Sequence, residues 1–123
     1  MAYFLVFIGG GFGSLTRFLL SKWVQNQFDG IHPVATFISN MSATLILGLV
    51  IFFTHNKIAE HQALRWLLVT GFCGGFSTFS TFSYETFSLF KLGAYGWAIS
   101  NVLVSISLGI LIIFLLSKAS PHV

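Results

Sequence analysis

Charged side chains are scarce in this sequence. Six lysines or arginines and three acids make up only 7% of the 123 residues, whereas 55% of the residues are hydrophobic. The mean hydropathy of +0.87 is too high for the surface of a soluble domain of this size. The basic residues are separated by apolar stretches and form no basic face for nucleic acid. The composition therefore predicts a membrane protein that contacts the lipid bilayer and has no nucleic-acid partner.

Reactive side chains are equally few. Cys73 is the only cysteine, which excludes an internal disulfide. All four histidines are expected in loops or in the C-terminal tail: His32, His55, His61 and His122. No acid pair or Cys-His pair is recognisable within the apolar stretches, and the glycines at 9–13 lack the preceding strand that a nucleotide-binding loop requires. These absences argue against an enzyme.

Four stretches contain no charged residue at all: residues 2–16, 33–54, 66–84 and 92–117. A membrane-spanning helix needs roughly 20 mainly apolar residues, so we predict four transmembrane helices, the first of which continues past Arg17. The connections between them are too short for a second domain. We therefore expect a single all-α domain of four transmembrane helices over residues 1–123.

The basic residues are divided equally between the two sides of the predicted membrane protein. Four spans place both termini and the loop between the second and third spans on the same side. That side has Lys57, Arg65 and Lys118, and the other has Arg17, Lys22 and Lys91. Because the positive-inside rule then favours neither orientation, we expect insertion in both orientations and an antiparallel homodimer. Four helices also leave little room for both a packed core and a polar conduit, so a pore needs two copies.

Small residues recur at four-residue spacing in the first and third stretches, as Gly9-x-x-x-Gly13 and Gly71-x-x-x-Gly75. Such spacing is typical of helices that approach each other closely in a membrane. For the first stretch, helix packing is the interpretation that we adopt.

The third stretch contains an unusual block, in which phenylalanine, serine and threonine alternate from residue 76 to residue 83. Gly74-Gly75 precedes it near the centre of the stretch, where helix propensity is lost, so we predict a break there. The carbonyls of Gly74 and Ser77 are then candidate ligands for a cation, because irregular backbone in a membrane requires something to satisfy it. The alternative is an ordinary glycine-rich helix crossing, in which the hydroxyls bond back to the preceding turn.

Two stripes are expected along this block, because residues three apart lie close together on a helix. The rings are Phe76, Phe79 and Phe82, and the hydroxyls are Ser77, Ser80 and Ser83. Aromatic edges carry partial positive charge and hydroxyls donate hydrogen bonds, so the two stripes suit passage of a small anion. The alternative is that the phenylalanines face lipid.

Other polar residues also lie inside the apolar stretches. Asn40 is in the second stretch, and Asn101 and Ser105 lie four residues apart on one face of the fourth. They either form hydrogen bonds between helices or line a pore. Arg17 either snorkels to the interface or attracts anions into a vestibule, and Glu85, at the end of the block, caps, pairs or gates.

The block resembles the third-helix signature of the Fluc/CrcB fluoride ion channels; it reads Gly71-Phe72-Cys73-Gly74-Gly75-Phe76-Ser77-Thr78-Phe79-Ser80-Thr81-Phe82-Ser83. The first stretch resembles the first-helix pattern of that family in Gly9-Gly10-Gly11, Gly13 and Arg17, and the second stretch resembles its second-helix pattern in Thr36, Asn40 and Gly48. The similarity covers essentially the whole chain.

This resemblance implies an antiparallel dual-topology homodimer in the bacterial plasma or inner membrane, with two pores that pass fluoride passively down its gradient and out of the cytoplasm. It also implies a central structural sodium ion, held by the main-chain carbonyls of Gly74 and Ser77 from both subunits. The other implied site residues are the pore rings Phe79 and Phe82, the pore donor Asn40, the polar track Ser80 and Ser83, the fourth-helix positions Asn101 and Ser105, and the vestibule residue Arg17.

Three positions depart from the family pattern, since Ser77 stands where threonine is usual, and Ala35 and Ala43 stand where glycine is usual. Serine keeps the hydroxyl and the backbone carbonyl, whereas the alanines add a methyl group at close helix contacts. Two other functions stay open. One is a dual-topology small multidrug transporter, which needs a membrane-embedded carboxylate that the first span lacks. The other is a non-conducting membrane assembly subunit, in which the glycines and hydroxyls serve only packing.

Overall fold

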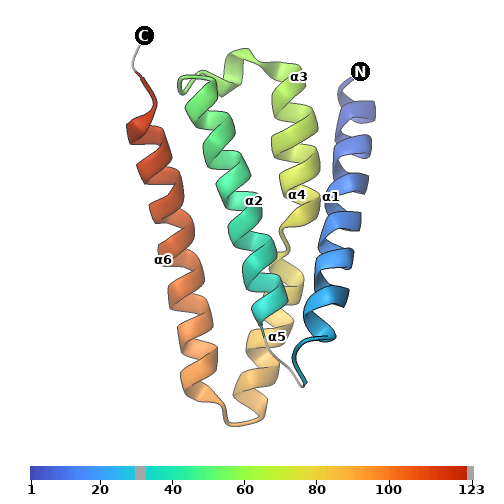
Figure 1. Ribbon diagram of the computed structural model, residues 1–123, viewed down its shortest axis with the longest axis vertical. Helices are drawn as coiled ribbons and strands as arrows, with labels where there is room; N and C mark the ends of the chain where they lie inside the picture. Colours follow the sequence, from blue (N-terminus) through green and yellow to red (C-terminus); the bar gives the residue numbers. More distant parts are fainter. Residues whose placement is uncertain (30–32, 122–123) are drawn as a thin grey trace.

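The computed structural model describes residues 1–29 and 33–121, and its regular structure is helical throughout (Figure 1). Three helices are long, namely α1 (Ala2–Gln25), α2 (Val34–Phe53) and α6 (Tyr95–Ala119). The third span consists of α3 (Gln62–Leu64), the π-helical segment η2 (Arg65–Cys73), α4 (Gly74–Phe76) and α5 (Phe79–Lys91). A single 3₁₀ turn, η1 (Ile58–Glu60), precedes it. Two of the predicted loop histidines, His32 and His122, lie outside the described residues.

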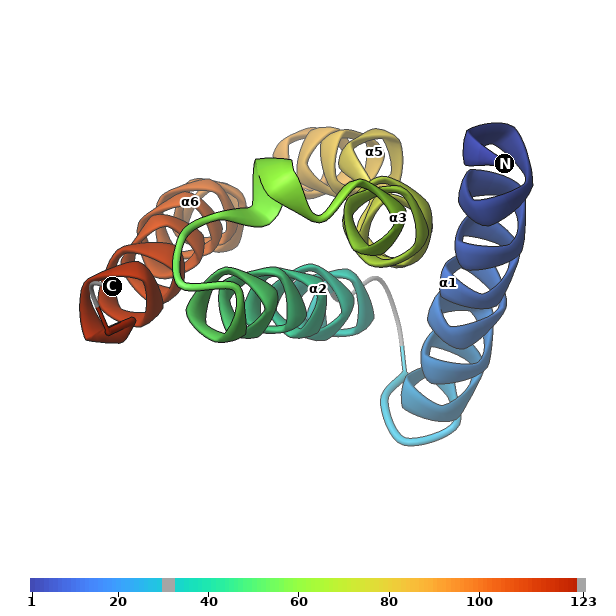
Figure 2. The ribbon, with the colours of Figure 1, turned by 90° about the horizontal axis from the view of Figure 1, so that it is seen from above.

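The spans run alternately up and down, so that the N-terminus and the C-terminal end of α6 lie at the same end of the bundle (Figure 1). Seen from above, α1 and α6 lie on opposite flanks of α2 and the third span (Figure 2). Within the described residues, α1, α2 and α6 are each long and apolar enough to cross a membrane. The third span is divided into shorter helices, which is why it is not among them. The predicted all-α architecture of four helical spans is confirmed.

Helix α1 packs against η2 and α4 through direct backbone contact. A Cβ atom added at Gly9 would overlap the carbonyl oxygen of Leu67, and one added at Gly13 would overlap the carbonyl oxygen of Phe72. On the facing segment, a Cβ atom at Gly75 would overlap the carbonyl oxygen of Gly10. Only glycine permits this approach, since any side chain would separate the backbones. The predicted role of the first-span glycines in helix packing is therefore confirmed.

The break in the third span lies at Ser77–Thr78 and not at Gly74-Gly75, so the predicted position is wrong by about three residues. Gly74 is helical (φ −63°, ψ −37°), whereas Ser77 (φ −83°, ψ 156°) and Thr78 (φ −150°, ψ 119°) are extended. The physical reason is that Gly75 is used for the close contact with α1, while Thr78 is the N-cap of α5. Its side-chain oxygen accepts a hydrogen bond from the Thr81 N–H (3.3 Å), as capping threonines do.

The centre of the bundle is small and its outside is apolar. Ala43, Cys73 and Phe76 form a buried cluster, and Ala35 and Ala43 are only 8% and 3% exposed. The two alanines that depart from the family pattern are thus both buried. Large exposed apolar residues cover α1, among them Tyr3, Phe4, Phe7, Phe12, Phe18 and Trp23. Such a surface is suited to lipid.

The loop after α2 is bound to the end of α6. Asn56, which has a positive φ of 62°, donates from Nδ2 to the carbonyl of Ser117 (3.3 Å) and accepts at Oδ1 from the Ser117 hydroxyl (2.8 Å). The hydroxyl of Ser120 donates to the carbonyl of Phe52 (3.0 Å). These bonds close one end of the α2–α6 pair.

Candidate functional site

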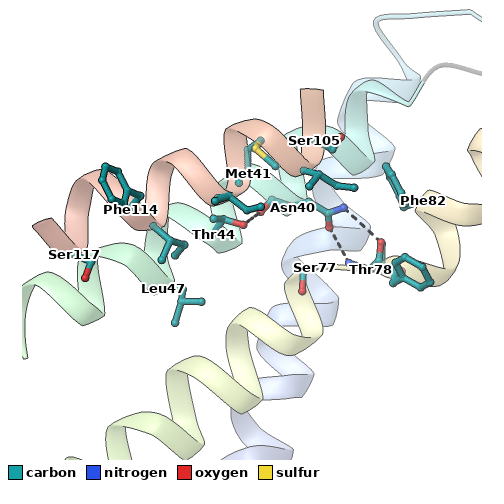
Figure 3. Close-up of a pocket in the computed structure, with 15 residues that line it drawn as sticks. Asn40, Met41, Thr44, Leu47, Ser77, Thr78, Phe82, Ser105, Phe114 and Ser117 are labelled. Carbon is teal, nitrogen blue, oxygen red and sulfur yellow. Dashed lines mark hydrogen bonds between the residues drawn. The ribbon is translucent and has the colours of Figure 1, made fainter. Parts of the chain in front are cut away.

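A groove of about 790 Å³ runs between α2, the helix break and α6. Most of its lining is apolar, but Asn40 and Ser105 lie with the extended backbone of residues 77–78 at one end, whereas Ser117 lies near Phe114 at the other (Figure 3). The polar residues that line it are Asn40, Thr44, Ser77, Thr78, Ser105 and Ser117. The groove therefore brings together the break and two of the predicted polar positions, Asn40 on α2 and Ser105 on α6.

The side-chain amide of Asn40 bonds to both the N–H and the carbonyl of one residue in the break, Thr78. Its Oδ1 accepts from the N–H of Thr78 (2.8 Å), and its Nδ2 donates to the carbonyl of Thr78 (3.5 Å) (Figure 3). The orientation of the amide is fixed, because only the oxygen can accept from an N–H. The first bond is short and the second is at the long limit for a hydrogen bond. Nδ2 is thus the loosely held half of this side chain.

The break frees carbonyl groups of the main chain, although the N–H of Ser77 still donates to the Cys73 carbonyl (2.9 Å) as in a helix. The N–H of Thr78, which would bond to the Gly74 carbonyl in a continuous helix, donates to Asn40 instead. Ser77 is already extended, so its carbonyl leaves the direction of the helix axis. Its hydroxyl, however, bonds back to the Cys73 carbonyl (2.7 Å), as the packing interpretation expected. The backbone, not the hydroxyl, is what Ser77 offers to a ligand.

The two predicted pore rings line the groove together. The centroids of Phe79 and Phe82 lie 6.2 Å apart at an interplanar angle of 34°. Phe76 does not belong to this pair, because it is only 5% exposed and packs against Phe72 at 5.5 Å. The predicted stripe of three rings is therefore wrong, since the extended residues 77–78 separate Phe76 from the other two.

The predicted hydroxyl track lies elsewhere. Ser80 and Ser83 are exposed on α5 and do not line the groove. Ser80 is 3.2 Å from the hydroxyl of Thr78, which also bonds to Thr81 (3.3 Å). The structure thus brings Ser80 to the N-cap of α5 but does not bring Ser83 to the groove of the single chain.

On the fourth span the two predicted positions differ. Asn101 is buried and donates from Nδ2 to the hydroxyl of Thr86 (3.0 Å), which joins α6 to α5. This is the interhelical hydrogen bond that was one of its two interpretations. The Oγ of Ser105 is buried without a hydrogen-bond partner among the described residues, although Ser105 lines the groove. Of the two, Ser105 is the group left available to a ligand.

Arg17 points inward from α1 and binds the end of α4. Its Nε donates to the carbonyl of Gly75 (3.2 Å), which the break deprives of its helical partner. The positive charge also lies where the half-helix ending at Phe76 has its negative pole. In the single chain, Arg17 is thus a half-buried residue whose Nε caps the break.

Replacement of Arg17 by leucine is expected to lower the free energy of unfolding by about 2 kcal/mol, because the Gly75 carbonyl loses a charged hydrogen-bond donor. Thermal or denaturant unfolding of the detergent-solubilised protein measures this loss. Lys22→Leu is the matched control, since Lys22 is exposed and its ammonium lies over the Phe18 ring (5.8 Å). Equal effects of the two substitutions would mean that the bond to Gly75 contributes nothing.

The N-cap contact of Thr78 was not predicted from the sequence, and the partner of Glu85 was left open. Thr78 had no predicted role, although a threonine that precedes an amphipathic run is an N-cap signal. Glu85 was predicted to cap, pair or gate, and it pairs, because its Oε1 accepts from the Thr36 hydroxyl (2.8 Å). The other oxygen of Glu85 and the Oγ of Ser39 are buried without partners in the described part of the chain. The α2–α5 contact is thus polar but incompletely paired.

These features define a class: a multi-pass membrane protein in which a broken helix presents its backbone to a polar groove. Residues 4–116 match the family model described as CrcB-like protein, Camphor Resistance (CrcB). The chain belongs to this CrcB family, as the resemblance predicted.

Three relatives, each named fluoride-specific ion channel FluC, illustrate the similarity. The protein from Solibacter usitatus is 36% identical over 109 residues, which cover 89% of each chain. That from Aquifex aeolicus is 41% identical over 112 residues (91% of this chain and 90% of the relative), and that from Pyrococcus abyssi is 43% identical over 114 residues (90% and 89%). The family is one of ion channels, which confirms that the chain is not an enzyme and that its location is a bacterial cell membrane.

Proposed function

We propose that this protein is a passive, fluoride-selective channel. The observation that carries the proposal is that one groove at the helix break contains the ring pair Phe79–Phe82, the amide of Asn40 and the unpartnered hydroxyl of Ser105. The names of the relatives support fluoride as the ion.

The chemistry of these groups suits a small, strongly hydrated anion. Nδ2 of Asn40 is held only by a 3.5 Å contact and can turn a proton toward the groove while Oδ1 stays on Thr78. Ring edges and the Ser105 hydroxyl complete a set of weak donors without a fixed cation that would trap the ion. Selectivity over chloride follows from a narrow path, since the larger ion cannot exchange its water for the same groups. Ser80, Ser83 and Asn101 remain proposed as the polar track beyond the groove.

A structural sodium ion is a further part of the proposal. The carbonyls of Gly74 and Ser77 fit such an ion, because the Thr78 N–H has left Gly74 and Ser77 is extended. Carbonyl oxygens are ligands of the kind that a hard cation requires in a membrane. The bound cation would supply positive charge that offsets these oxygens at the break.

The groove also supports an antiparallel homodimer. It is open on one side, and polar backbone that faces hydrocarbon is costly, so a cover is required. A second copy in the opposite orientation provides one and brings a second pair of Gly74 and Ser77 carbonyls. Arg17 is bound to the Gly75 carbonyl at the break, so it does not count among the charges of the loops. The remaining basic residues are Lys57, Arg65 and Lys118 on one side of the membrane and Lys22 and Lys91 on the other. This near balance favours insertion in both orientations.

The direction of transport follows from the acid chemistry of fluoride. Hydrogen fluoride crosses lipid as the neutral acid and dissociates inside, which leaves an anion that cannot recross the bilayer unaided. A passive channel then exports fluoride from the cytoplasm without an energy source. Arg17, on the α1 side of the break, is proposed to add positive potential to the vestibule.

Purified protein in liposomes is expected to release loaded fluoride, but not chloride, when a potassium ionophore balances the charge. An ion-selective electrode measures each anion, and protein-free liposomes give the background. Proton-coupled uptake of a cationic dye that is lost in Glu85→Gln would instead support the multidrug transporter. No flux of either kind from folded protein would support the assembly subunit and overturn the proposed channel.

A further inference from the structure

The position of the helix break is not explained by the residues of the third span alone. Gly74 and Gly75 are the weakest helix formers in this segment, yet both lie within helix, and the chain departs from helix at Ser77 and Thr78. Serine and threonine do not by themselves end a helix in a membrane, since their hydroxyls can bond to the preceding turn, as that of Ser77 does. Another part of the molecule must hold the break open.

We infer that Asn40 is a positioning residue that keeps the third span broken, by taking the Thr78 N–H away from the carbonyl of Gly74. The bond from this N–H to Oδ1 is 2.8 Å long, shorter than the 3.3 Å cap within α5. No other side chain of the described residues bonds to the Thr78 N–H. The amide on α2 therefore replaces the helical partner that the break removes.

The membrane makes this single replacement decisive. An N–H group without a partner is costly in hydrocarbon, which offers no hydrogen-bond acceptor to satisfy it. Without the amide at residue 40, the nearest way to satisfy Thr78 is to restore its bond to the Gly74 carbonyl. The third span would then continue as helix through residues 77–78, and the Gly74 carbonyl would be occupied.

The other end of the break is held by a different helix. Arg17 of α1 binds the Gly75 carbonyl (3.2 Å), whereas Asn40 of α2 binds Thr78. The two half-helices are thus each anchored to a separate neighbour. The orientation of the Gly74 and Ser77 carbonyls consequently depends on α2, and this link to the cation rests on the proposed channel function.

The test uses the full-length protein, labelled with ¹³C and ¹⁵N and reconstituted in lipid. The ¹³Cα and ¹³Cβ chemical shifts of Ser77 and Thr78 report whether the backbone of each residue is extended or helical. We expect extended values in the wild type, helical values in Asn40→Ala, and extended values in Asn40→Asp, because an acid side chain in either protonation state still offers an oxygen to the Thr78 N–H. This rescue by aspartate separates the inferred role from general packing.

Asn56→Ala is the matched control, since Asn56 also makes two amide bonds, but to Ser117 at the end of the bundle. It is expected to destabilise the protein without moving the shifts of residues 77 and 78. Extended values in Asn40→Ala would overturn the inference. If that variant does not fold, Asn40→Asp decides alone, because helical values there would equally overturn it.

A second measurement separates this inference from the proposed sodium ion. The midpoint temperature of thermal unfolding is compared between sodium chloride and N-methylglucamine chloride at the same concentration. A sodium-dependent rise is expected in the wild type and in Asn40→Asp, and its loss is expected in Asn40→Ala. If the wild type shows no rise, the sodium proposal fails while the chemical shifts still test the role of Asn40. A rise that persists in Asn40→Ala would show that the carbonyls do not depend on this amide, which contradicts the inference.

Discussion

Replacement of Phe79 by isoleucine is expected to reduce fluoride efflux from liposomes to the level of protein-free vesicles. The Phe79 ring is 80% exposed in the single chain, lines the groove and lies 6.2 Å from Phe82. Isoleucine keeps an apolar side chain of similar bulk but has no ring edge with partial positive charge. At the position of Phe79, an anion that has lost its water would then lack the ring edge that compensates for that loss. Conduction fails if any one step becomes this unfavourable.

The matched control is Phe87→Ile. Phe87 lies on the same helix, is 62% exposed and does not line the groove, so its replacement tests lipid-facing phenylalanine in general. Efflux through Phe87→Ile is expected to equal that of the wild type, measured with the same electrode and at the same protein density. Wild-type efflux through Phe79→Ile would mean that the rings face lipid and that the groove conducts by other groups.

Most of the fold could be predicted from the absence of charge. The uncharged stretches at 33–54 and 92–117 agree with α2 (Val34–Phe53) and α6 (Tyr95–Ala119), because a spanning helix cannot tolerate unpaired charge. The position of the break could not be predicted in this way. Glycine propensity pointed to Gly74-Gly75, but propensity is a local property, and the bond from Thr78 to Asn40 joins residues that are 38 positions apart.

Candidate site residues that are unusual in lipid could be identified from the sequence. The predictions that depended on which face of a continuous third span a side chain occupies were wrong. Asn40 was identified because an amide in hydrocarbon requires a partner, and that partner is the broken backbone. Phe79 and Phe82 follow the break and keep their spacing on α5. Phe76 precedes the break and Ser77 lies in it, so the extended backbone at residues 77–78 changes the direction of Phe76 relative to Phe79 and of Ser77 relative to Ser80. Stripes drawn on one continuous helix could not include that change.

Replacement of Gly9 by alanine is expected to prevent stable folding, with a loss of about 3 kcal/mol or more in the free energy of unfolding. The added methyl group would overlap the carbonyl oxygen of Leu67 and lie 3.0 Å from the backbone nitrogen of Phe72. Both obstacles are main chain, which cannot turn aside as a flexible side chain can. The two backbones would have to separate, and this would draw Arg17 away from the Gly75 carbonyl. The measurements are the yield of monodisperse protein after detergent extraction and the midpoint of its thermal unfolding.

Gly11→Ala is the matched control, two residues along the same helix. A Cβ atom at Gly11 meets nothing within 4 Å, and alanine is a better helix former than glycine, so this variant is expected to be as stable as the wild type or slightly more so. A difference between the two variants isolates the contact with η2, because chemistry, helix and depth in the membrane are nearly the same. If Gly9→Ala were as stable as Gly11→Ala, α1 would not touch the third span through its backbone. Arg17 would then lack the close approach that brings its guanidinium to the break, and the vestibule would have to be assembled without it.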